Sequence, residues 1–343
     1  MTADKEHILL VRLSSLGDII LASPVASALR TARPAARITW LVDSGYRELV
    51  ENDPNVDEVL EFDYTGAHRG PAGIRRLAEE LAPVELMIDL QHKVRTSLLG
   101  AYLRPREKKT LVKRRGFGVL RALIGKDAIM RAPHQVWRYL AVIDAADTDS
   151  PPPRPVLYLD RRLRTEALAE TQLDEGRGPL IGLFPGARHE LKRWPPVHLA
   201  ALADRCVAEG MRIAVLGGPG DEGLVHSTLE CMKTEPLLVS TAGSLQHLGA
   251  LISACDAVVS PDSGPAHMAA GLGVAVITLF GPTSPERWAP VGQRARVVQQ
   301  GLPCSPCSNH GSGSCSEGTH ECMASLSPER VWQELDEVLR DVG

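Results

Sequence analysis

Two aspartates follow apolar runs of the sequence, at points where a buried strand gives way to a loop. Asp18 comes after residues 7–13, and Asp262 comes after residues 257–261. A carboxylate in such a place can accept the proton of an attacking hydroxyl, or it can bind sugar hydroxyls. Each aspartate also stands beside the start of a helical pattern, so helix capping is the alternative role for both.

The residues after Asp262 have the pattern of a helix start that binds an anion. Ser263 and Gly264 occupy the cap, a proline takes the next position, and His267 continues the helix. Free N–H groups and the positive end of the helix dipole favour a phosphate at such a start. Because a carboxylate repels an anion, we expect Asp262 to face sugar hydroxyls. The loop therefore predicts a ligand that carries both a sugar and a phosphate.

Other segments of the C-terminal half are candidates for binding the same ligand. Gly186 and Ala187 follow a predicted strand, and Lys192 comes soon after them, where a basic side chain can neutralise a diphosphate. The alternative for this lysine is a solvated surface position. Asp221 and Glu222 end a glycine-rich loop, and either acid can bind ribose hydroxyls, although Asp221 equally suits a helix cap.

Strand-like and helix-like segments alternate along most of the 343 residues. Strands are expected at 7–13, 38–42, 56–62 and 86–90, and a second series begins at 180–184. Such alternation predicts parallel sheets covered by helices, and the length suits roughly two domains. A proline-rich run at 151–155 marks the linker. The fold class is therefore α/β, with two Rossmann-like, doubly wound parallel-sheet domains that we expect to face a cleft.

The charge is small overall but locally uneven. The formal net charge is −4, yet basic side chains crowd one part of the N-terminal half, at Lys93, Arg95, Arg104, Arg106, Lys108, Lys109, Lys113, Arg114 and Arg115. This basic cluster can attract a polyanion or an anionic membrane surface. Its alternative is a solvated surface. Nucleic acid is not expected, because the total charge is negative and few aromatic residues interleave with the cluster.

Four of the seven cysteines lie close together in the sequence. Cys304, Cys307, Cys315 and Cys322 have the spacing C-x2-C-x7-C-x6-C. Thiolates at this spacing could bind a structural zinc, and free thiols or an oxidation-sensitive loop are the alternatives. The pattern Asp147-Thr148-Asp149 has the form of a catalytic metal motif, but it lies just before the proline run. We therefore expect no cofactor to be required for the chemistry, and only a possible structural zinc.

Several motifs in order along the chain resemble one family. They are Ser14-Ser15-Leu16-Gly17-Asp18, Phe184-Pro185-Gly186-Ala187 with Lys192-Arg193-Trp194-Pro195, Asp262-Ser263-Gly264-Pro265-Ala266-His267 and Gly281-Pro282-Thr283. Together they resemble the bacterial lipopolysaccharide heptosyltransferases of glycosyltransferase family 9. The resemblance implies the glycosyltransferase B architecture, with an acceptor-binding domain at 1–165 and a nucleotide-sugar-binding domain at 176–326. It also implies that a C-terminal helix at 327–343 packs back on the N-terminal domain.

The resemblance further implies an inverting transfer of heptose from ADP-L-glycero-D-manno-heptose to the inner core of lipopolysaccharide. Asp18 is then the general base, and Lys192 matches the family's lysine that contacts the donor phosphate. The donor-binding candidates are Gly186, Ala187, Lys192, Asp221, Glu222, Asp262, Ser263, Gly264 and His267. The acidic acceptor, a Kdo-bearing lipid A, suits binding by Gly17, Lys93, Arg95, Arg114 and Arg115.

The place and the exact activity of the protein are expectations of the same kind. No signal sequence and no apolar stretch of about 18 residues is visible, so we expect a cytoplasmic protein that binds peripherally at the inner face of the inner membrane. Residues 192–195 favour an enzyme that adds the second heptose. The alternatives are a family 9 transferase of another sugar, a sugar-nucleotide epimerase of similar architecture, and a non-enzymatic sugar-nucleotide sensor.

Overall fold

The computed structural model describes residues 6–111, 133–171, 178–241 and 243–340. The chain forms two compact units. The described residues of the first unit run to Leu111 and continue from Gln135 to Tyr158, and those of the second begin at Leu159 and also include Pro133 and His134. The basic residues Lys113, Arg114 and Arg115 lie outside the described residues.

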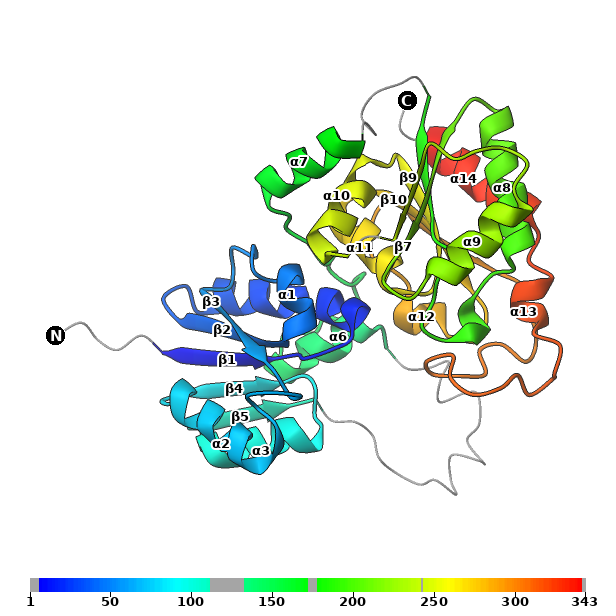
Figure 1. The fold of residues 1–343 in the computed structure, drawn as a ribbon. Helices are drawn as coiled ribbons and strands as arrows, with labels where there is room; N and C mark the ends of the chain where they lie inside the picture. The colour runs from blue at the N-terminus through cyan, green and yellow to red at the C-terminus, as the bar shows by residue number, and fades with distance from the viewer. Residues whose placement is uncertain (1–5, 112–132, 172–177, 242, 341–343) are drawn as a thin grey trace. The chain divides into compact units, whose positions relative to one another are not determined.

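The first unit is a five-stranded parallel sheet with helices on both faces (Figure 1). The strand order is β3-β2-β1-β4-β5, which reverses direction between β1 and β4. Its strands are β1 (His7–Val11), β2 (Arg37–Asp43), β3 (Glu58–Phe62), β4 (Leu86–Asp89) and β5 (Glu107–Thr110). Its α-helices are α1 (Leu16–Ala32), α2 (Gly70–Leu81), α3 (Val94–Leu103) and α6 (Gln135–Leu140), with short 3-10 helices η1 (Ser44–Leu49) and η2 (Ala141–Ile143).

The second unit repeats this plan with six parallel strands in the order β11-β10-β9-β6-β7-β8. The order reverses between β6 and β9. The strands are β6 (Leu180–Leu183), β7 (Arg212–Gly217), β8 (Leu238–Thr241), β9 (Ala257–Pro261), β10 (Ala275–Phe280) and β11 (Ala295–Gln299). The helices are α7 (Arg161–Thr171), η3 (Glu190–Lys192), α8 (Pro196–Ala208), α9 (Glu222–Cys231), α10 (Leu245–Ala254), α11 (Gly264–Leu272), α12 (Pro285–Trp288), α13 (Glu321–Ala324) and α14 (Pro328–Arg340).

The central strands of both sheets are continuous apolar runs because helices cover both of their faces. All five residues of β1 and all six of β10 are buried. In the first unit α2 and α3 cover one face and α1 and α6 the other, and in the second α8, α9 and α14 lie opposite α10 and α11 (Figure 1). The predicted fold class of two Rossmann-like parallel-sheet domains is confirmed.

The boundary between the units lies earlier than the predicted end of the first domain at residue 165. Leu159 packs closely on Gly249, where an added β-carbon would come within 2.6 Å of the leucine side chain. The backbone N–H of Asp160 donates to Gln246 Oε1 at 3.0 Å, and Arg164 Nε donates to Ser253 Oγ at 2.8 Å. These contacts fasten α7 to α10, so residues 159–165 belong to the second unit.

The last helix, α14, buries its apolar face in the second unit. Its apolar face, Val331, Trp332, Leu335 and Val338, is buried in the same core as residues of β6, β10 and α8. Trp194 Nε1 donates to the carbonyl of Leu326 at 2.9 Å just before this helix. The second unit itself therefore buries the apolar face of α14. That residues 327–343 also pack back on the N-terminal domain stays a prediction.

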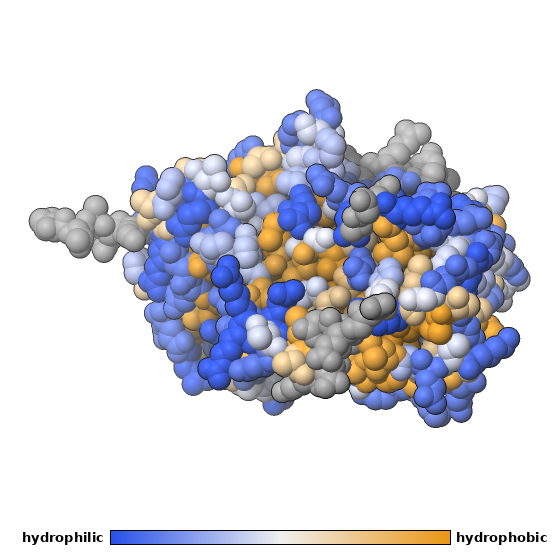
Figure 2. Space-filling model, turned by 90° about the horizontal axis from the view of Figure 1, so that it is seen from above, coloured by the Kyte–Doolittle hydropathy of each residue, from blue (hydrophilic) through white to orange (hydrophobic). Residues whose placement is uncertain are grey.

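Hydrophilic side chains occupy much of the visible surface, with apolar residues exposed between them (Figure 2). Among the described residues, no helix combines the length and the apolar character needed to cross a bilayer. The apolar residues are instead concentrated in the two sheet cores.

Candidate functional site

The two sheets each bring loops together at the point where their strand order reverses. In open α/β sheets, ligands bind at this switch point, beyond the carboxyl ends of the strands. In the first unit these are the connections after β1 and β4, where Asp18 lies in the first turn of α1 and Lys93 at the start of α3. In the second they are the loops after β6 and β9, which carry Gly186 and Asp262. The topology therefore places the principal predicted residues at the ligand-binding edge of each sheet.

Asp18 lies in the first turn of α1 and is held by three side chains. Arg12 Nη2 approaches its Oδ2 at 2.8 Å, and Tyr139 donates its hydroxyl to Oδ1 at 2.6 Å. Ser15, the N-cap residue, donates its hydroxyl to Oδ2 at 3.0 Å. The side chain of Asp18 is 18% exposed. Its contact with the N-cap residue agrees with the capping alternative, but capping does not require the contacts with Arg12 and Tyr139.

The surroundings of Asp18 keep its carboxyl group ionised. Burial alone would raise its pKa, but the charge of Arg12 and the hydrogen bonds from Tyr139 and Ser15 outweigh burial and lower the pKa below the ordinary value. The guanidinium is itself fixed, since Arg12 Nη1 donates to the carbonyl of Leu90 at 2.8 Å and the group lies 5.3 Å from the Tyr139 ring centroid. Asp18 is thus a charged carboxylate in a fixed position at neutral pH.

Sequence reasoning missed both Arg12 and Tyr139. Arg12 did leave a signal, because it is a charged residue inside the apolar run at residues 7–13. Buried arginine is rare unless it is paired, so the run alone indicates a nearby carboxylate. Tyr139 left no signal, since it lies on α6, 121 positions from Asp18.

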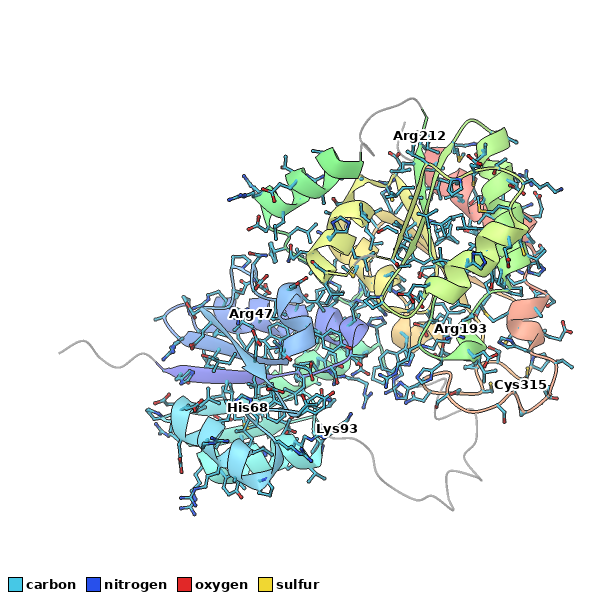
Figure 3. The ribbon with its side chains drawn as sticks, viewed as in Figure 1. Arg47, His68, Lys93, Arg193, Arg212 and Cys315 are labelled. Atoms are coloured by element: carbon cyan, nitrogen blue, oxygen red, sulfur yellow. The ribbon has the colours of Figure 1, made fainter. Side chains whose placement is uncertain are left out.

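The predicted acceptor-binding residues that the structure describes lie at the carboxyl edge of the first sheet. Gly17 is in the first turn of α1, and Lys93 is the N-cap of α3. Figure 3 shows Lys93 at the end of the unit beyond the strands. Arg95 lies 4.6 Å from the Tyr64 ring centroid, and Val94, which lies between Lys93 and Arg95 in the sequence, is 84% exposed. The structure thus brings together basic groups and an exposed apolar residue, while Arg114 and Arg115 lie outside the described residues.

In the second unit, Asp262 is almost fully buried and directly paired. Its side chain is 5% exposed, and Lys192 Nζ lies 2.7 Å from Oδ2. Thr283 donates its hydroxyl to the same oxygen at 2.7 Å. The predicted neighbourhood of Lys192 and Asp262 is therefore present, and Lys192 is not a solvated surface lysine, because its side chain is only 15% exposed. Thr283 belongs to the Gly281-Pro282-Thr283 motif, but no role was predicted for this residue from the sequence.

The start of α11 follows Asp262 directly. Ser263 is the N-cap, but its side chain makes no capping hydrogen bond to the helix, and its hydroxyl instead lies 3.0 Å from Ser260 Oγ. Gly264 begins the helix and His267, 6% exposed, continues it. The first-turn amides of α11 are not capped by the Ser263 side chain, which suits the predicted anion site.

The loops after β6 and β7 meet at Asp221. Its Oδ2 accepts the Gly218 N–H at 3.0 Å, and a β-carbon at Gly186 would fall 2.4 Å from the carboxyl group. A side chain at position 186 would therefore displace the Asp221 carboxyl group. Glu222 is exposed, and its Oε1 accepts the Gly220 N–H at 3.2 Å. Asp221 is used to hold these loops together, whereas the Glu222 carboxylate faces solvent.

The neighbouring Ala187 is buried, and its carbonyl accepts a hydrogen bond from Arg193 Nε at 3.0 Å. This contact ties the loop after β6 to the segment that carries Lys192. Gly186, Ala187 and Lys192, which are only near one another in the sequence, thus belong to one connected structure.

The four cysteines lie in the long segment between β11 and α14. Cys322 is buried, Cys307 is exposed, and Cys304 and Cys315 are intermediate, and none of the four forms a disulfide. Figure 3 places Cys315 at the same end of the second unit as Arg193. Across the described part of the chain, no three His, Cys, Asp or Glu side chains are arranged to hold a metal ion. The structural zinc remains a prediction, and no step of the chemistry is assigned to it.

Known proteins that are similar to this chain agree on one family. The family profile described as Glycosyltransferase family 9 (heptosyltransferase) matches residues 74–315. Lipooligosaccharide heptosyltransferase 2 of Haemophilus influenzae is 28% identical, covering 97% of this chain and 99% of the relative. Lipopolysaccharide heptosyltransferase 1 of Pseudomonas aeruginosa is 27% identical, covering 97% of this chain and 98% of the relative.

Solved structures support the same architecture. A family 9 glycosyl transferase from Veillonella parvula superposes with a TM-score of 0.80 at 25% identity and covers 99% of both chains. The ADP-heptose lipopolysaccharide heptosyltransferase II of Escherichia coli gives a TM-score of 0.77 at 24% identity, covering 98% of this chain and 99% of that one. At that identity the second likeness shows the fold alone.

Proposed function

The chain belongs to glycosyltransferase family 9, and we propose that it transfers heptose from ADP-L-glycero-D-manno-heptose to the inner core of lipopolysaccharide with inversion at the anomeric carbon. The observation that carries this proposal is the pairing of Lys192 with Asp262 beside the start of α11, at the switch point of the second sheet. It supplies a cation and helix amides for a diphosphate, and a carboxylate for sugar hydroxyls, in one place.

The donor is bound by the second unit. The Lys192 ammonium has three N–H donors and uses one on Asp262, which leaves others for the diphosphate. Lys192 and Thr283 both contact Oδ2 of Asp262, so Oδ1 is the oxygen we assign to a sugar hydroxyl. Glu222, being exposed at the end of the glycine loop, is the acid we assign to the ribose, in place of Asp221.

The acceptor is activated by the first unit. The acceptor hydroxyl attacks the anomeric carbon, its proton passes to the Asp18 carboxylate, and the bond between that carbon and the phosphate oxygen breaks. ADP leaves with the electron pair, and its growing negative charge is stabilised by Lys192 and the amides of α11. Asp18 begins this step ionised, because the pKa of its carboxyl group is lowered by Arg12 and by hydrogen bonds that outweigh its burial.

We propose addition of the second heptose, acting on an acceptor that already carries the first. The support is that the Haemophilus influenzae relative and a Salmonella typhimurium relative at 27% identity are both named heptosyltransferase 2. The measurement is transfer from ADP-heptose to Kdo-lipid A and to its monoheptosylated form. Faster transfer to the second acceptor is expected, and equal or faster transfer to the first would overturn this assignment.

The general base is tested by Asp18→Asn. We expect the variant to lose transfer while its affinity for ADP, measured by calorimetry, stays at the wild-type value, because the donor residues belong to the other unit. Asp43→Asn is the matched control, since Asp43 also ends a strand of the first sheet but bonds only to the Gly45 N–H among its described side-chain contacts. Wild-type turnover by Asp18→Asn would falsify the role of Asp18.

We further propose that the surface around Val94 binds the anionic, lipid-bearing acceptor at the cytoplasmic face of the inner membrane. Lys93 and Arg95 are exposed beside Val94, and Tyr102 on the same helix is 38% exposed. Anionic lipid attracts the charges and the apolar side chain enters the interface. Val94→Asp is expected to reduce cosedimentation with anionic vesicles, whereas Val197→Asp, at the 57% exposed Val197 of the second unit, is expected not to. Equal loss in both would contradict the proposal.

A further inference from the structure

The cysteine-bearing segment, residues 302–323, is packed on the residues that surround Asp262. The Cys307 and Ser308 N–H groups donate to the carbonyl of Pro282 at 3.0 and 2.8 Å. Ser305 donates its hydroxyl to the carbonyl of Gly281. These bonds fix the turn that immediately precedes Thr283, one of the two groups that contact Asp262.

The same segment lies against Lys192, the other group that contacts Asp262. A β-carbon placed on Gly311 would come within 2.8 Å of both Cγ and Cε of Lys192, so the lysine stem passes directly over this glycine. His320 Nε2 lies 2.6 Å from the carbonyl of Leu191, the residue before Lys192. The stem and the preceding peptide of Lys192 are therefore both held by one segment.

We infer that residues 302–323 act as a clamp that positions Lys192 and Thr283 on Asp262, with Gly311 and His320 as positioning residues of the donor site. A lysine side chain loses up to about 2 kcal/mol of conformational entropy when it is fixed. A surface that restricts the stem beforehand leaves less to lose when the diphosphate binds and when charge develops on it. The inference rests on the proposed function only for the consequence in turnover.

The clamp also gives the cysteine segment a role that needs no bound metal. The segment has little regular structure, and its backbone donors at positions 307 and 308 are used on the donor turn. Cys322 Sγ lies 3.1 Å from the place of a β-carbon on Gly281, and Met323 Sδ lies 2.6 Å from it. The end of the clamp is thus packed against the same turn as its beginning, which closes the segment around the donor residues.

Two glycines of the segment provide a matched test. Gly311 has a φ of +76° and Gly313 a φ of +96°, so alanine carries left-handed strain at either position. Only at Gly311 does the added methyl group meet Lys192, because nothing lies within 4 Å of a β-carbon at Gly313. The difference between Gly311→Ala and Gly313→Ala therefore isolates the contact with Lys192 from backbone strain.

The experiment measures the rate at which Lys192 is acylated by an amine-reactive ester, read by peptide mass spectrometry on the full-length protein without donor. We expect Gly311→Ala to change this acylation rate at least about threefold. We also expect it to lower kcat/KM for transfer about tenfold, which corresponds to 1.4 kcal/mol. Gly313→Ala should resemble wild type in both. His320→Asn should move both quantities in the same direction as Gly311→Ala, because asparagine tolerates the left-handed backbone but cannot reach Leu191.

The two readouts separate failure of the clamp from failure of the proposed function. Unchanged acylation of Lys192 in Gly311→Ala, or an equal change in Gly313→Ala, overturns the clamp whatever the turnover is. If acylation changes only in Gly311→Ala and the wild-type protein transfers no heptose, the clamp is upheld and the proposed function is rejected. A changed acylation rate with wild-type turnover overturns the claim that the clamp serves the donor site.

Discussion

Tyr139→Phe tests how Asp18 is held, because it removes one hydrogen bond and little else. The hydroxyl that donates to Asp18 Oδ1 at 2.6 Å is lost, while the ring that packs near the Arg12 guanidinium at 5.3 Å is kept. A hydrogen bond to an ionised group contributes about 1.5–3 kcal/mol, and one pKa unit corresponds to about 1.4 kcal/mol. The pKa of Asp18, which these contacts hold below its ordinary value, is therefore expected to rise in the variant.

The sign of the effect on stability follows from the lowered pKa of Asp18. The ionised carboxylate stabilises the fold above the unfolded-state pKa, and this contribution is lost as the pH falls through the folded-state pKa. The variant has a smaller contribution to lose. Its free energy of unfolding should be about 1.5–3 kcal/mol below wild type near neutral pH, and the difference should narrow as the pH falls through the folded-state pKa of the carboxyl group.

The assay is urea unfolding of wild type and variant over a series of pH values, together with the pH profile of kcat/KM. The acidic limb of the kcat/KM profile should move to higher pH in Tyr139→Phe, by the same pKa change that the unfolding data give. Tyr102→Phe is the control for the unfolding data, since Tyr102 is 38% exposed on the same unit and is not among the side chains that hold Asp18. If the two variants unfold alike at every pH and the acidic limb stays in place, Tyr139 does not hold the carboxylate.

Three further substitutions test the second unit. Lys192→Met leaves the buried Asp262 without its cation, and we expect a loss of about 3–5 kcal/mol in urea unfolding with weaker ADP binding in calorimetry; an unchanged midpoint would contradict the pairing. Leu335→Ala opens a cavity in the core that receives α14, so it should lower the free energy of unfolding of the second unit alone by about 2–5 kcal/mol, measured from its calorimetric transition. A shift of the first unit's transition would contradict that packing. Gly186→Ala drives a methyl group to 2.4 Å from the Asp221 carboxyl group, so ADP should bind at least about tenfold more weakly, and wild-type affinity would show that the loop can yield.

The positions of Asp18 and Asp262 could be predicted from the sequence because the reasoning needed only local patterns. An apolar run long enough for a strand is followed in both cases by a turn and a helix start. Parallel strands end at one edge of a sheet, so any residue just after such a run lies at that edge. The residue that follows a buried strand is thus placed by the strand itself, without knowledge of the strand order.

The partners of these aspartates depend on the strand order, which the local pattern does not contain. Lys192 reaches Asp262 across 70 positions because β6 and β9 are neighbours at the reversal of the second sheet. Tyr139 reaches Asp18 because α6 packs beside α1. Periodicity predicts that each of these elements exists, but it does not say which elements become neighbours.

The last helix, α14, shows in energetic terms why a local pattern does not specify neighbours. Its pattern predicts an amphipathic helix with Val331, Trp332, Leu335 and Val338 on one face, and this helix is present. Burial of an apolar face is favourable against any apolar surface, since the hydrophobic effect is proportional to area and has no direction. The sequence of α14 therefore specifies that its face is buried but not by which core. That choice is made by the surface that α8 and β10 leave uncovered in the second unit.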